Sequence, residues 1–597
     1  MSISANFPNV FPSLELNFAQ SQQLDPRVTF SRSTTAPYYD GKTSVLAEQN
    51  LVLQSQTFGT SWIIQNATQT ANSITAPDGT STGTTLTSTS SVSTSVGAYQ
   101  SVSTIIGSTL AIYAKVGTSN FIGVTSSSGG QSYANFNLNT GVVSSSSNCT
   151  ASIINAGNGW YRCVIANTTT AGTNQFFIAP KDADPSGNPW QFGTCASGNY
   201  VYIWGAQLEQ RSSVTAYNAT TTTPITNYIP QLLTAPINAP RFDFNPTTGE
   251  SLGLLIEEQR TNLSTYSSGF SNAGWTKNNA SITANINIAP DGTQTVSKLV
   301  ENTTASVSHY ASCPAITPSA STAYTGSIYV KAGERNYALF ELNGGGGDAY
   351  SFINLTTGVI TTGGGTGTFT STNVGNGWWR VTCTYTTSST ANLSVFVYPA
   401  TSSSTYVYTG DGYSGIYIWG AQLEAGAFAT SYIPTTSAQV TRAADVENMT
   451  GTNFSSWYNI VQGSFYAEAK AIYNLSTTGG ARYLLANTNT NSYYLYANQN
   501  SANITNYDGT NITQAAVTDF SVFNKFMSTY GSSNKTINNN GLTVVSGSYT
   551  QQWANNTGLG IGQSGPSGSL PWNGWIKKVS FYPIQFTSSQ QIALTGS

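Results

Sequence analysis

The amino-acid sequence predicts an all-β protein built from tandem β-sandwich modules, and three observations support this fold class. Charged residues make up 8% of the 597 residues and aromatic residues 12%, whereas a typical soluble chain carries roughly 25% charged residues. Gly, Ser, Thr and Asn separate short runs of Val, Ile, Thr and Tyr, which is the pattern of strands joined by turns. Finally, a long segment of the sequence occurs twice. Such an aromatic-rich chain is not disordered.

The repeated segment contains five phrases in the same order. Each phrase lies 213 to 218 residues from its copy. A unit of about 170 residues is too long for a solenoid repeat and has the size of a self-contained sandwich. The phrases are APDGT (76–80 and 289–293), IYAKVG and IYVKAG (112–117 and 328–333), NLNTGVV and NLTTGVI (137–143 and 354–360), GNGWYR and GNGWWR (157–162 and 375–380), and YIWGAQLE (202–209 and 417–424).

The same charged and aromatic residues return in both copies. We expect the repeated arginines and glutamates to form ion pairs or hydrogen bonds to loops, with a repeated ligand site as the alternative. We expect the tryptophans to be core residues rather than platforms for sugars, because Trp160 and Trp378 each follow a tight NG turn and begin a strand. The repeated structural set is Trp160, Arg162, Trp204, Glu209, Trp378, Arg380, Trp419 and Glu424.

The strand that ends in YIWGAQLE is apolar on both faces. Tyr200, Tyr202 and Trp204 alternate with Val201, Ile203 and Gly205. A strand of this kind is covered on both sides. We expect the cover to be a second sheet or a neighbouring subunit.

Repeat boundaries and composition divide the chain into five parts. After about residue 445 the sequence no longer matches the repeat and shows the pattern of short alternating strands, which indicates a third all-β unit. Within it, TSSQQIAL (587–594) predicts one helical turn capped by Ser588 or Ser589. The parts are an N-terminal attachment segment (1–50), sandwich module 1 (51–235), a connector (236–263), sandwich module 2 (264–445) and a C-terminal domain (446–597).

Charge and hydropathy exclude several classes of function. The net charge is −3 and no basic stripe is present, so we expect no nucleic-acid binding. No run approaches the roughly 18 apolar residues that span a bilayer, so we expect no membrane partner. The first residues lack the basic and apolar regions of a secretory signal. We therefore expect synthesis in a cytoplasm without export by the general secretory route.

The sequence predicts no cofactor. Its five cysteines are odd in number and show no CxxC spacing, and His309 is the single histidine. We expect Cys149 and Cys163, which flank one hairpin turn, to be small buried side chains on strands rather than a disulfide. The one candidate metal site is a calcium site on the loop KDADPSG, with Asp182 and Asp184 as ligands.

Several long phrases resemble bacteriophage virion proteins. They are PRFDFNPTTGESLGLLIEEQRTNL (240–263) and GAQLEAGAFATSYIPTTSAQVTRAADV (420–446), which are similar to phage head spike or tail fibre structural proteins. The two modules resemble carbohydrate-binding-module-like jelly rolls. The C-terminal unit, with SWYN and NGWIKKVSFYP, resembles a concanavalin A-like (laminin-G-like) β-sandwich. The resemblance implies a fold of two tandem jelly rolls followed by this third sandwich, with an extended N-terminal segment.

This resemblance implies a virion structural protein, a head or tail fibre or a capsid decoration. We expect the N-terminal segment to contact other virion proteins, the sandwiches to point outward, and self-association, with a homotrimer as the common solution. We expect host adhesion through carbohydrate binding by the C-terminal unit. The alternatives are a purely structural cement protein without glycan binding and, third, a polysaccharide depolymerase. We expect no enzyme, because acid–base residues are scarce.

Glycan binding would use exposed aromatic rings together with Asn or Asp side chains. We select aromatic residues that the sequence places on loops, next to turn formers. The candidates are Trp190, Tyr350, Tyr507, Asp508 and Trp553. For glycoside hydrolysis the best carboxylate pair is Glu468 and Asp508, but we expect Glu468 to be a strand-edge acid and Asp508 a turn residue.

Overall fold

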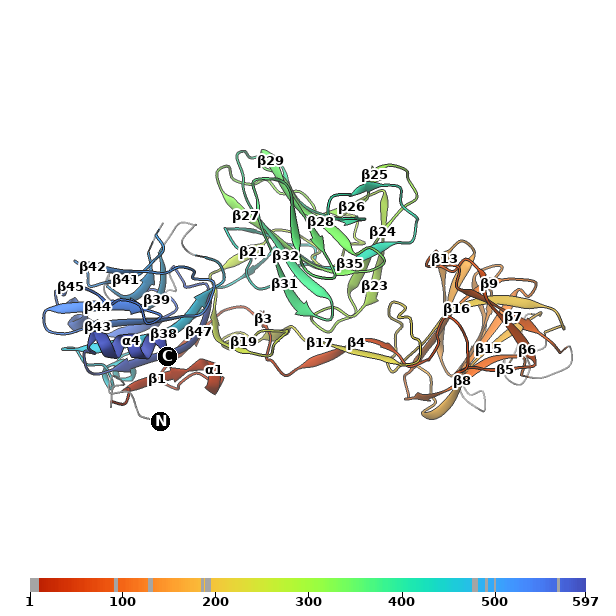
Figure 1. Ribbon diagram of the computed structural model, residues 1–597, viewed down its shortest axis with the longest axis horizontal. Helices are drawn as coiled ribbons and strands as arrows, with labels where there is room; N and C mark the ends of the chain where they lie inside the picture. The colour runs from red at the N-terminus through yellow and green to blue at the C-terminus, as the bar shows by residue number, and fades with distance from the viewer. Residues whose placement is uncertain are drawn as a thin grey trace.

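The computed structural model consists of three β-sandwiches in a row (Figure 1). It describes residues 10–90, 95–126, 132–183, 187, 195–474, 481–488, 492–498, 501–565 and 570–597. Every strand pair in the sheets is antiparallel, and the helices are short. The predicted all-β fold class, with two tandem sandwich modules and a third sandwich, is confirmed.

Module 1 packs two six-stranded sheets face to face around its own core. The first sheet consists, in spatial order, of β12 (Val142–Ser147), β11 (Ser132–Asn137), β10 (Phe121–Ser126), β15 (Gly172–Lys181), β8 (Gly97–Thr104) and β5 (Ile63–Gln65). The second consists of β13 (Thr150–Gly157), β14 (Trp160–Ala166), β9 (Thr109–Val116), β16 (Tyr200–Glu209), β7 (Gly83–Ser88) and β6 (Ala67–Ile74).

Module 2 repeats this arrangement strand for strand. Its first sheet consists of β22 (Thr276–Asn278), β26 (Tyr310–Ser312), β33 (Leu393–Ala400), β28 (Tyr337–Gly344), β29 (Gly347–Asn354) and β30 (Ile360–Gly365). Its second sheet consists of β23 (Ala280–Asn287), β24 (Val296–Glu301), β35 (Gly415–Ala425), β27 (Ala323–Ala332), β32 (Trp378–Thr386) and β31 (Thr368–Gly375).

The C-terminal sandwich recruits strands from outside residues 446–597. One sheet contains β19 (Phe242–Phe244), β20 (Ser251–Ile256), β47 (Gly574–Tyr582), β38 (Gly463–Ala471), β43 (Asn524–Tyr530), β44 (Asn534–Asn539) and β45 (Val545–Ser548), with β1 (Leu14–Asn17) also on β47. The other contains β2 (Thr29–Ser31), β37 (Val446–Thr450), β46 (Gly558–Ile561), β39 (Arg482–Asn487), β40 (Tyr493–Ala497), β41 (Asn503–Tyr507) and β42 (Ile512–Ala516).

The remaining described elements are four two-stranded pairs and a few short helices. The two-stranded pairs are β3 (Ala36–Tyr38) with β18 (Leu233–Ala235), β4 (Ser44–Asn50) with β17 (Ile225–Pro230), β21 (Arg260–Asn262) with β36 (Val440–Arg442), and β25 (Val307–Ser308) with β34 (Val407–Tyr408). The described helices are α1 (Phe18–Ser21), α3 (Thr452–Ser455), η1 (Gln552–Asn555) and α4 (Ser588–Gly596). Thr587 caps α4 through a capping box with Gln590, one residue before the predicted cap. No helix in the described segments has the length and apolar character to cross a bilayer.

The chain leaves the C-terminal sandwich, reaches module 1 and returns. After β1 and β2, the strands β3 and β4 lead outward, and β17 and β18 come back antiparallel to them. These four strands form a two-stranded arm beneath module 2 (Figure 1). The arm packs Tyr39, Ala47 and Ile229 against Trp378 and Trp419 of module 2. One face of the apolar strand β35 is therefore covered by the core of module 2, and the other face is covered by the arm of the same chain.

Part of the predicted attachment segment is built into the C-terminal sandwich. Leu14 pairs with Phe581 and Thr29 pairs with Asn448. Leu16 and Phe18 are buried in the core of that sandwich. The division at residue 50 therefore differs from the structure, because apolar positions in a short segment did not reveal which distant sheet they complete. The predicted connector, residues 236–263, is also more than a linker, because its strand β20 pairs with β47 of the C-terminal sandwich.

A buried charge cluster lies where the N-terminal segment, the connector and the end of module 2 meet. Asp445 accepts a hydrogen bond from Arg32 at 2.8 Å and a second one from Arg241. Arg241 also bonds Glu257 at 2.7 Å, and Arg442 lies 3.5 Å from Glu257. All five side chains are at most 2% exposed. We call these residues the charge cluster.

The cluster fixes the ionisation of its carboxyl groups. Burial alone would raise the pKa of Glu257, but the guanidiniums of Arg442 and Arg241 and hydrogen bonds from Ser431 lower it to about 2. The neighbouring Glu447 is also fully buried, and its carboxyl oxygens have no hydrogen-bond partner among the described residues. Burial and the charge of Asp445 raise the pKa of Glu447 well above its ordinary value. The pKa values of these two neighbouring carboxyl groups are therefore shifted in opposite directions.

The first prediction concerns Asp445→Asn. The change leaves Arg32 and Arg241 buried without their shared carboxylate, so we expect unfolding to become easier by about 3–5 kcal/mol. Chemical denaturation measures this loss, and limited proteolysis should cut the 1–50 segment faster than in the parent protein. Asp78→Asn, on an exposed turn, is the control. Equal stability of the two variants would contradict a central role for the cluster.

The second prediction concerns pH. Because the folded-state pKa of Glu257 lies below its ordinary value of 4.5, at about 2, its contribution is present above pH 4.5. The contribution declines as the pH falls from 4.5 towards 2, by about 3 kcal/mol in total. Denaturation curves of the parent and of Glu257→Gln across this interval should converge as the pH falls. A constant difference between the two proteins would refute this assignment.

Candidate functional site

The repeated residues tie one loop in each module to the sheet. Arg162 donates from Nη1 to the carbonyl of Thr215 at 2.7 Å, and Arg380 donates from Nη2 to the carbonyl of Thr430 at 2.6 Å. The equivalent glutamates bond the same threonines from the other side. Glu209 and Glu424 each accept from the backbone N–H and the hydroxyl of Thr215 and Thr430, respectively. Burial raises the pKa of both glutamates.

The repeated tryptophans lie inside these assemblies. Trp160, Trp204, Trp378 and Trp419 are each 1% exposed. Trp204 packs on Tyr217 with ring centroids 4.7 Å apart, and Trp419 packs on Tyr432 at the same distance. The repeated phrases thus encode a loop clamp. Seven of these eight residues are buried and offer no open surface to a ligand, whereas Arg380 is partly exposed. The search for a functional site therefore turns to other surfaces.

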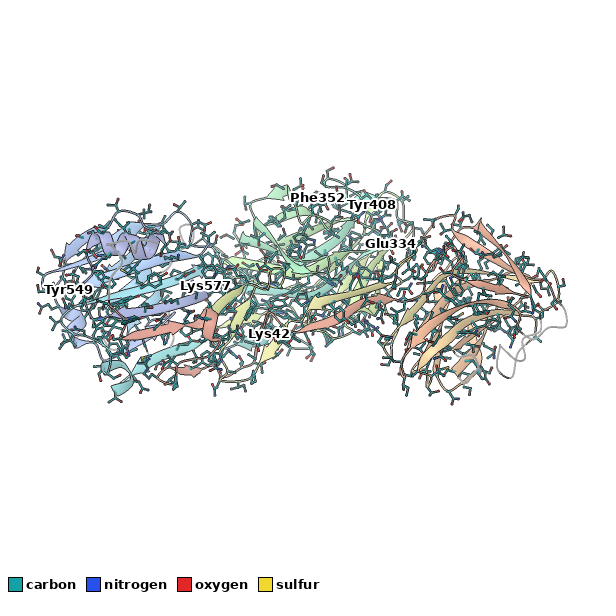
Figure 2. The ribbon with its side chains drawn as sticks, turned by 60° about the horizontal axis from the view of Figure 1, so that its bottom comes forward. Lys42, Glu334, Phe352, Tyr408, Tyr549 and Lys577 are labelled. Carbon is teal, nitrogen blue, oxygen red and sulfur yellow. The ribbon has the colours of Figure 1, made fainter. Side chains whose placement is uncertain are left out.

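An aromatic surface covers the outer face of the first sheet of module 2. Side chains alternate along each strand, so the residues that do not enter the core share this face. We define the aromatic face as Tyr310, Tyr337, Leu339, Tyr350, Phe352, Phe396, Tyr398 and Tyr406. Tyr398, Phe352 and Leu339 form its buried floor, and the other rings are half-buried around them. Figure 2 shows Phe352 at the outer edge of the middle sandwich.

The rings of the aromatic face contact one another. Tyr398 lies 5.0 Å from Tyr310 and 5.5 Å from Tyr406, measured between ring centroids. Phe352 and Tyr350 lie 6.1 Å and 6.5 Å from Tyr406. The strands β26, β28, β29 and β33 and the loop that carries Tyr406 therefore present one continuous layer of rings.

Polar groups are placed within this layer. Glu341 accepts a hydrogen bond from the Tyr398 hydroxyl at 2.7 Å and from the Asn343 amide at 2.8 Å. Burial and the Glu341 carboxylate raise the pKa of Tyr398. Asp348 is on the same side of β29 as Tyr350, two residues along the strand, and is exposed. The face therefore combines rings, amide and hydroxyl groups and two carboxylates.

Module 1 carries the same sheet with only part of this aromatic layer, because Phe121, Tyr133 and Phe177 match Tyr337, Tyr350 and Phe396. The strand registers match Phe352 with Asn135 and Tyr398 with Ala179. Leu339 corresponds to Gly123. Module 1 instead buries Lys181, whose ammonium bonds Asn135 at 3.2 Å. The centre of the aromatic face, with Phe352 and Tyr398, is therefore what distinguishes the second copy from the first.

The residues predicted as glycan ligands do not form one site. Tyr350 belongs to the aromatic face. Tyr507 lies on the C-terminal sandwich, where its hydroxyl donates to the Gly509 carbonyl at 2.7 Å. It joins a tyrosine group with Tyr493, whose ring lies 6.0 Å away. Trp190 lies outside the described residues.

Two of these candidates are buried in the C-terminal sandwich. Trp553 is a fully buried core residue whose indole N–H donates to the Tyr507 carbonyl at 3.2 Å. Asp508 is fully buried and accepts from the backbone N–H groups of Asn511 at 2.6 Å and Thr550 at 2.9 Å. Both positions disagree with the predicted exposed contact to a glycan, because core packing and turn formation use these side chains.

Asp182 of the predicted calcium site holds a loop in place through hydrogen bonds. Asp182 accepts from the Ser119 hydroxyl at 2.8 Å, from the Asn199 amide at 2.9 Å and from the backbone of Ala196. Burial opposes ionisation, but these hydrogen bonds lower the pKa of Asp182. Asp184 lies outside the described residues. Among the described residues, no three His, Cys, Asp or Glu side chains gather as a metal site.

The five cysteines are free thiols, and all but Cys149 are buried. Cys163 pairs with Ile153 across the hairpin, not with Cys149. His309 is buried, and its ring nitrogens contact the carbonyls of Asn279 and Tyr408.

Sequence reasoning missed most of the aromatic face, because Tyr310, Phe352, Phe396 and Tyr398 are spread over three strands. A signal was present in the repeat. The segment 176–181 reads FFIAPK, and the equivalent segment 395–400 reads VFVYPA. Comparing the copies for outward positions that become aromatic, instead of for residues that are retained, identifies Tyr398 and Phe352.

Comparisons with known proteins give distant likenesses in structure only. No family model and no curated protein matches the sequence. The N-terminal tandem of two CBM22 domains of Paenibacillus barcinonensis Xyn10C matches with 10% identity and a TM-score of 0.20, over 65% of this chain and 100% of that chain. Domains LG4-5 of the mouse laminin alpha1 chain match with 10% identity and a TM-score of 0.17, over 48% and 89%. Likenesses this distant say nothing about what this chain binds.

The third prediction tests the loop clamp. Thr215→Val and Thr430→Val each remove a hydroxyl bond to a buried glutamate, so we expect each variant to lose about 1–3 kcal/mol of stability. Thermal unfolding measures both. Thr80→Val, which acts at an exposed turn, serves as the control. If one clamp variant lost stability and the other did not, the two clamps would not be equivalent.

Proposed function

We propose that this chain is a non-enzymatic virion structural protein that binds host-surface glycans through the aromatic face of module 2. One observation carries the glycan proposal: the duplicated sandwiches share a scaffold, but only the second fills the centre of this outward sheet face with the rings of Phe352 and Tyr398. Structural duplication explains the shared core. It does not explain why Phe352 and Tyr398 occupy positions that hold Asn135 and Ala179 in module 1.

The chemistry of the aromatic face suits a saccharide. A tyrosine ring has an apolar body and a polar tip, so it can stack on the C–H face of a sugar while its hydroxyl bonds the ring substituents. Ligand sites typically combine apolar and aromatic walls with a few fixed polar groups. Glu341 and Asn343 are such groups, and their hydrogen bonds to each other and to Tyr398 hold them in place.

The virion location and the absence of catalysis are further parts of this proposal. The virion location is supported by the resemblance of residues 240–263 and 420–446 to phage fibre proteins. The non-enzymatic role is supported by the side chains of the aromatic face. Its carboxyl groups are Glu341, which is committed to Tyr398, and the exposed Asp348. The C-terminal sandwich is a second region for adhesion, through the tyrosine group around Tyr507 and Tyr493.

The fourth prediction tests the aromatic face with matched variants. Tyr350→Ala removes a half-buried ring of the face, and Tyr133→Ala removes the equivalent ring of module 1. On a glycan array probed with the full chain, we expect Tyr350→Ala to weaken binding tenfold or more, about the effect of losing one aromatic anchor. Tyr133→Ala should bind as the parent protein does.

Other outcomes discriminate between the alternatives. Equal loss in both variants, or no loss in either, would contradict a role for the aromatic face. No binding by the parent protein would favour the structural cement hypothesis. If Tyr350→Ala changed the molecular mass in solution, the face would be a subunit contact. Release of reducing sugar from bound polysaccharide would overturn the non-enzymatic proposal.

A further inference from the structure

A cavity of about 620 Å³ lies between module 2 and the C-terminal sandwich. It is distinct from the aromatic face, because it faces the second sheet of module 2. Four parts of the chain line it: strands β31 and β32 of module 2, the connector hairpin β19–β20, residues 37–39 of the arm, and the C-terminal sandwich where β38 ends and β47 begins. Figure 2 places Lys577, which is on β47, at this junction.

The module 2 wall of the cavity is a row of threonine hydroxyls. Thr368 pairs with Thr384 and Thr370 pairs with Thr382 across β31 and β32, and the next pair is Thr372 with Arg380. All six side chains line the cavity. The Thr370 and Thr382 hydroxyls bond each other at 2.6 Å, and each hydroxyl keeps hydrogen-bonding capacity.

Module 1 keeps hydroxyl groups on one of the two strands, where Thr150 and Ser152 match Thr368 and Thr370, but its other strand is apolar at the same place. Its register matches Thr382 with Val164 and Thr384 with Ala166. Val164 and Ala166 pack with Val214 in a small apolar cluster. Where β14 of module 1 carries apolar side chains, β32 of module 2 presents the hydroxyls of Thr382 and Thr384 to a cavity. The scaffold therefore does not require these two hydroxyls.

The opposite wall supplies aromatic rings and an unpaired cation. Lys470, Tyr473 and Trp575 line the cavity from the C-terminal sandwich. The Lys470 ammonium lies 4.6 Å from the centroid of Trp575 and 4.9 Å from that of Phe523. In the part of the chain that the structure describes, no carboxylate lies within 4.0 Å of Lys470, while its neighbour Lys577 pairs with Glu250 at 2.7 Å.

Two cations in the cavity lining form no ion pair with a described residue. The two carboxyl groups of the cavity already have partners: Asp243 accepts from the Trp575 indole at 2.8 Å, and Glu257 belongs to the charge cluster. Arg380 donates to Thr430 and to the Ser327 hydroxyl, and within the described ranges it forms no ion pair. Lys470 and Arg380 thus remain as cations on opposite walls.

We propose that this cavity binds an acidic oligosaccharide, with carboxylate groups held by Lys470 and Arg380. The threonine row would exchange hydrogen bonds with the sugar hydroxyls, and Trp575 and Tyr473 would contact the sugar rings. An acidic ligand distinguishes this site from the aromatic face, whose charged groups are the carboxylates Glu341 and Asp348. The ligand would contact both sandwiches at once. This inference does not rest on glycan binding by the aromatic face.

Isothermal titration calorimetry of the full chain with tetragalacturonic acid tests the proposal. We expect binding by the free acid, weakening as salt is added, and no binding by its methyl ester. Lys470→Met keeps the apolar stem and should weaken binding about tenfold or more. The double variant Thr370→Val with Thr382→Val removes both partners of one hydroxyl pair and should also weaken it. Ser152→Val, at the position in module 1 that matches Thr370, should have no effect.

The outcomes separate this site from the aromatic face. Tyr350→Ala should bind the acid as the parent does, and Lys470→Met should keep the array profile of the parent. Equal affinity for the acid and its ester, or an unchanged affinity in Lys470→Met, would overturn the proposal. Tighter binding of a hexaglutamate peptide at the cavity would assign the site to an acidic peptide and would also overturn it.

Discussion

Three distant stretches of the chain depend on the charge of Asp445. This carboxylate bonds Arg32 from the N-terminal segment and Arg241 from the connector, and Arg241 in turn bonds Glu257. Burying such charges is costly unless every partner is present. The cluster therefore forms only when all three segments are in register, which fixes where the arm begins and how the C-terminal sandwich meets module 2. Only 8% of the residues in this chain are charged, yet five of them gather in the charge cluster. The positions of the surrounding segments therefore depend on this cluster.

Duplication supplied two equivalent sandwiches, and divergence acted on their outer faces. The cores and the loop clamps remained alike, because they determine whether each module folds. The outward positions changed in two places. Module 2 gained rings on one sheet and threonines on the other, where module 1 has small, polar or aliphatic residues. One scaffold thus carries surfaces of different chemistry, and the unmodified copy is an internal standard for both.

The sequence was sufficient for the fold class, and less so for the assembly. The repeated Trp160 and Trp378, the NG turns and the sparse charges indicated tandem sandwiches without further information. The pairing of Leu14 with Phe581 could not be predicted, because a short strand contains no record of its distant partner. Retained residues such as Glu209 and Glu424 proved to be internal clamps, whereas the aromatic face lies at positions that differ between the copies. Loop position also misled for Trp553, since a loop residue can still fold back into a core.

The arm has a mechanical consequence. Module 1 is joined to the remainder of the protein by two covalent crossings, β4 going out and β17 returning, which lie side by side in antiparallel register. A tensile force between module 1 and the C-terminal sandwich is therefore shared by two peptide backbones, and the hydrogen bonds between them are not pulled apart first. A single-stranded tether would extend under the same load. This geometry makes the molecule resist stretching along its long axis.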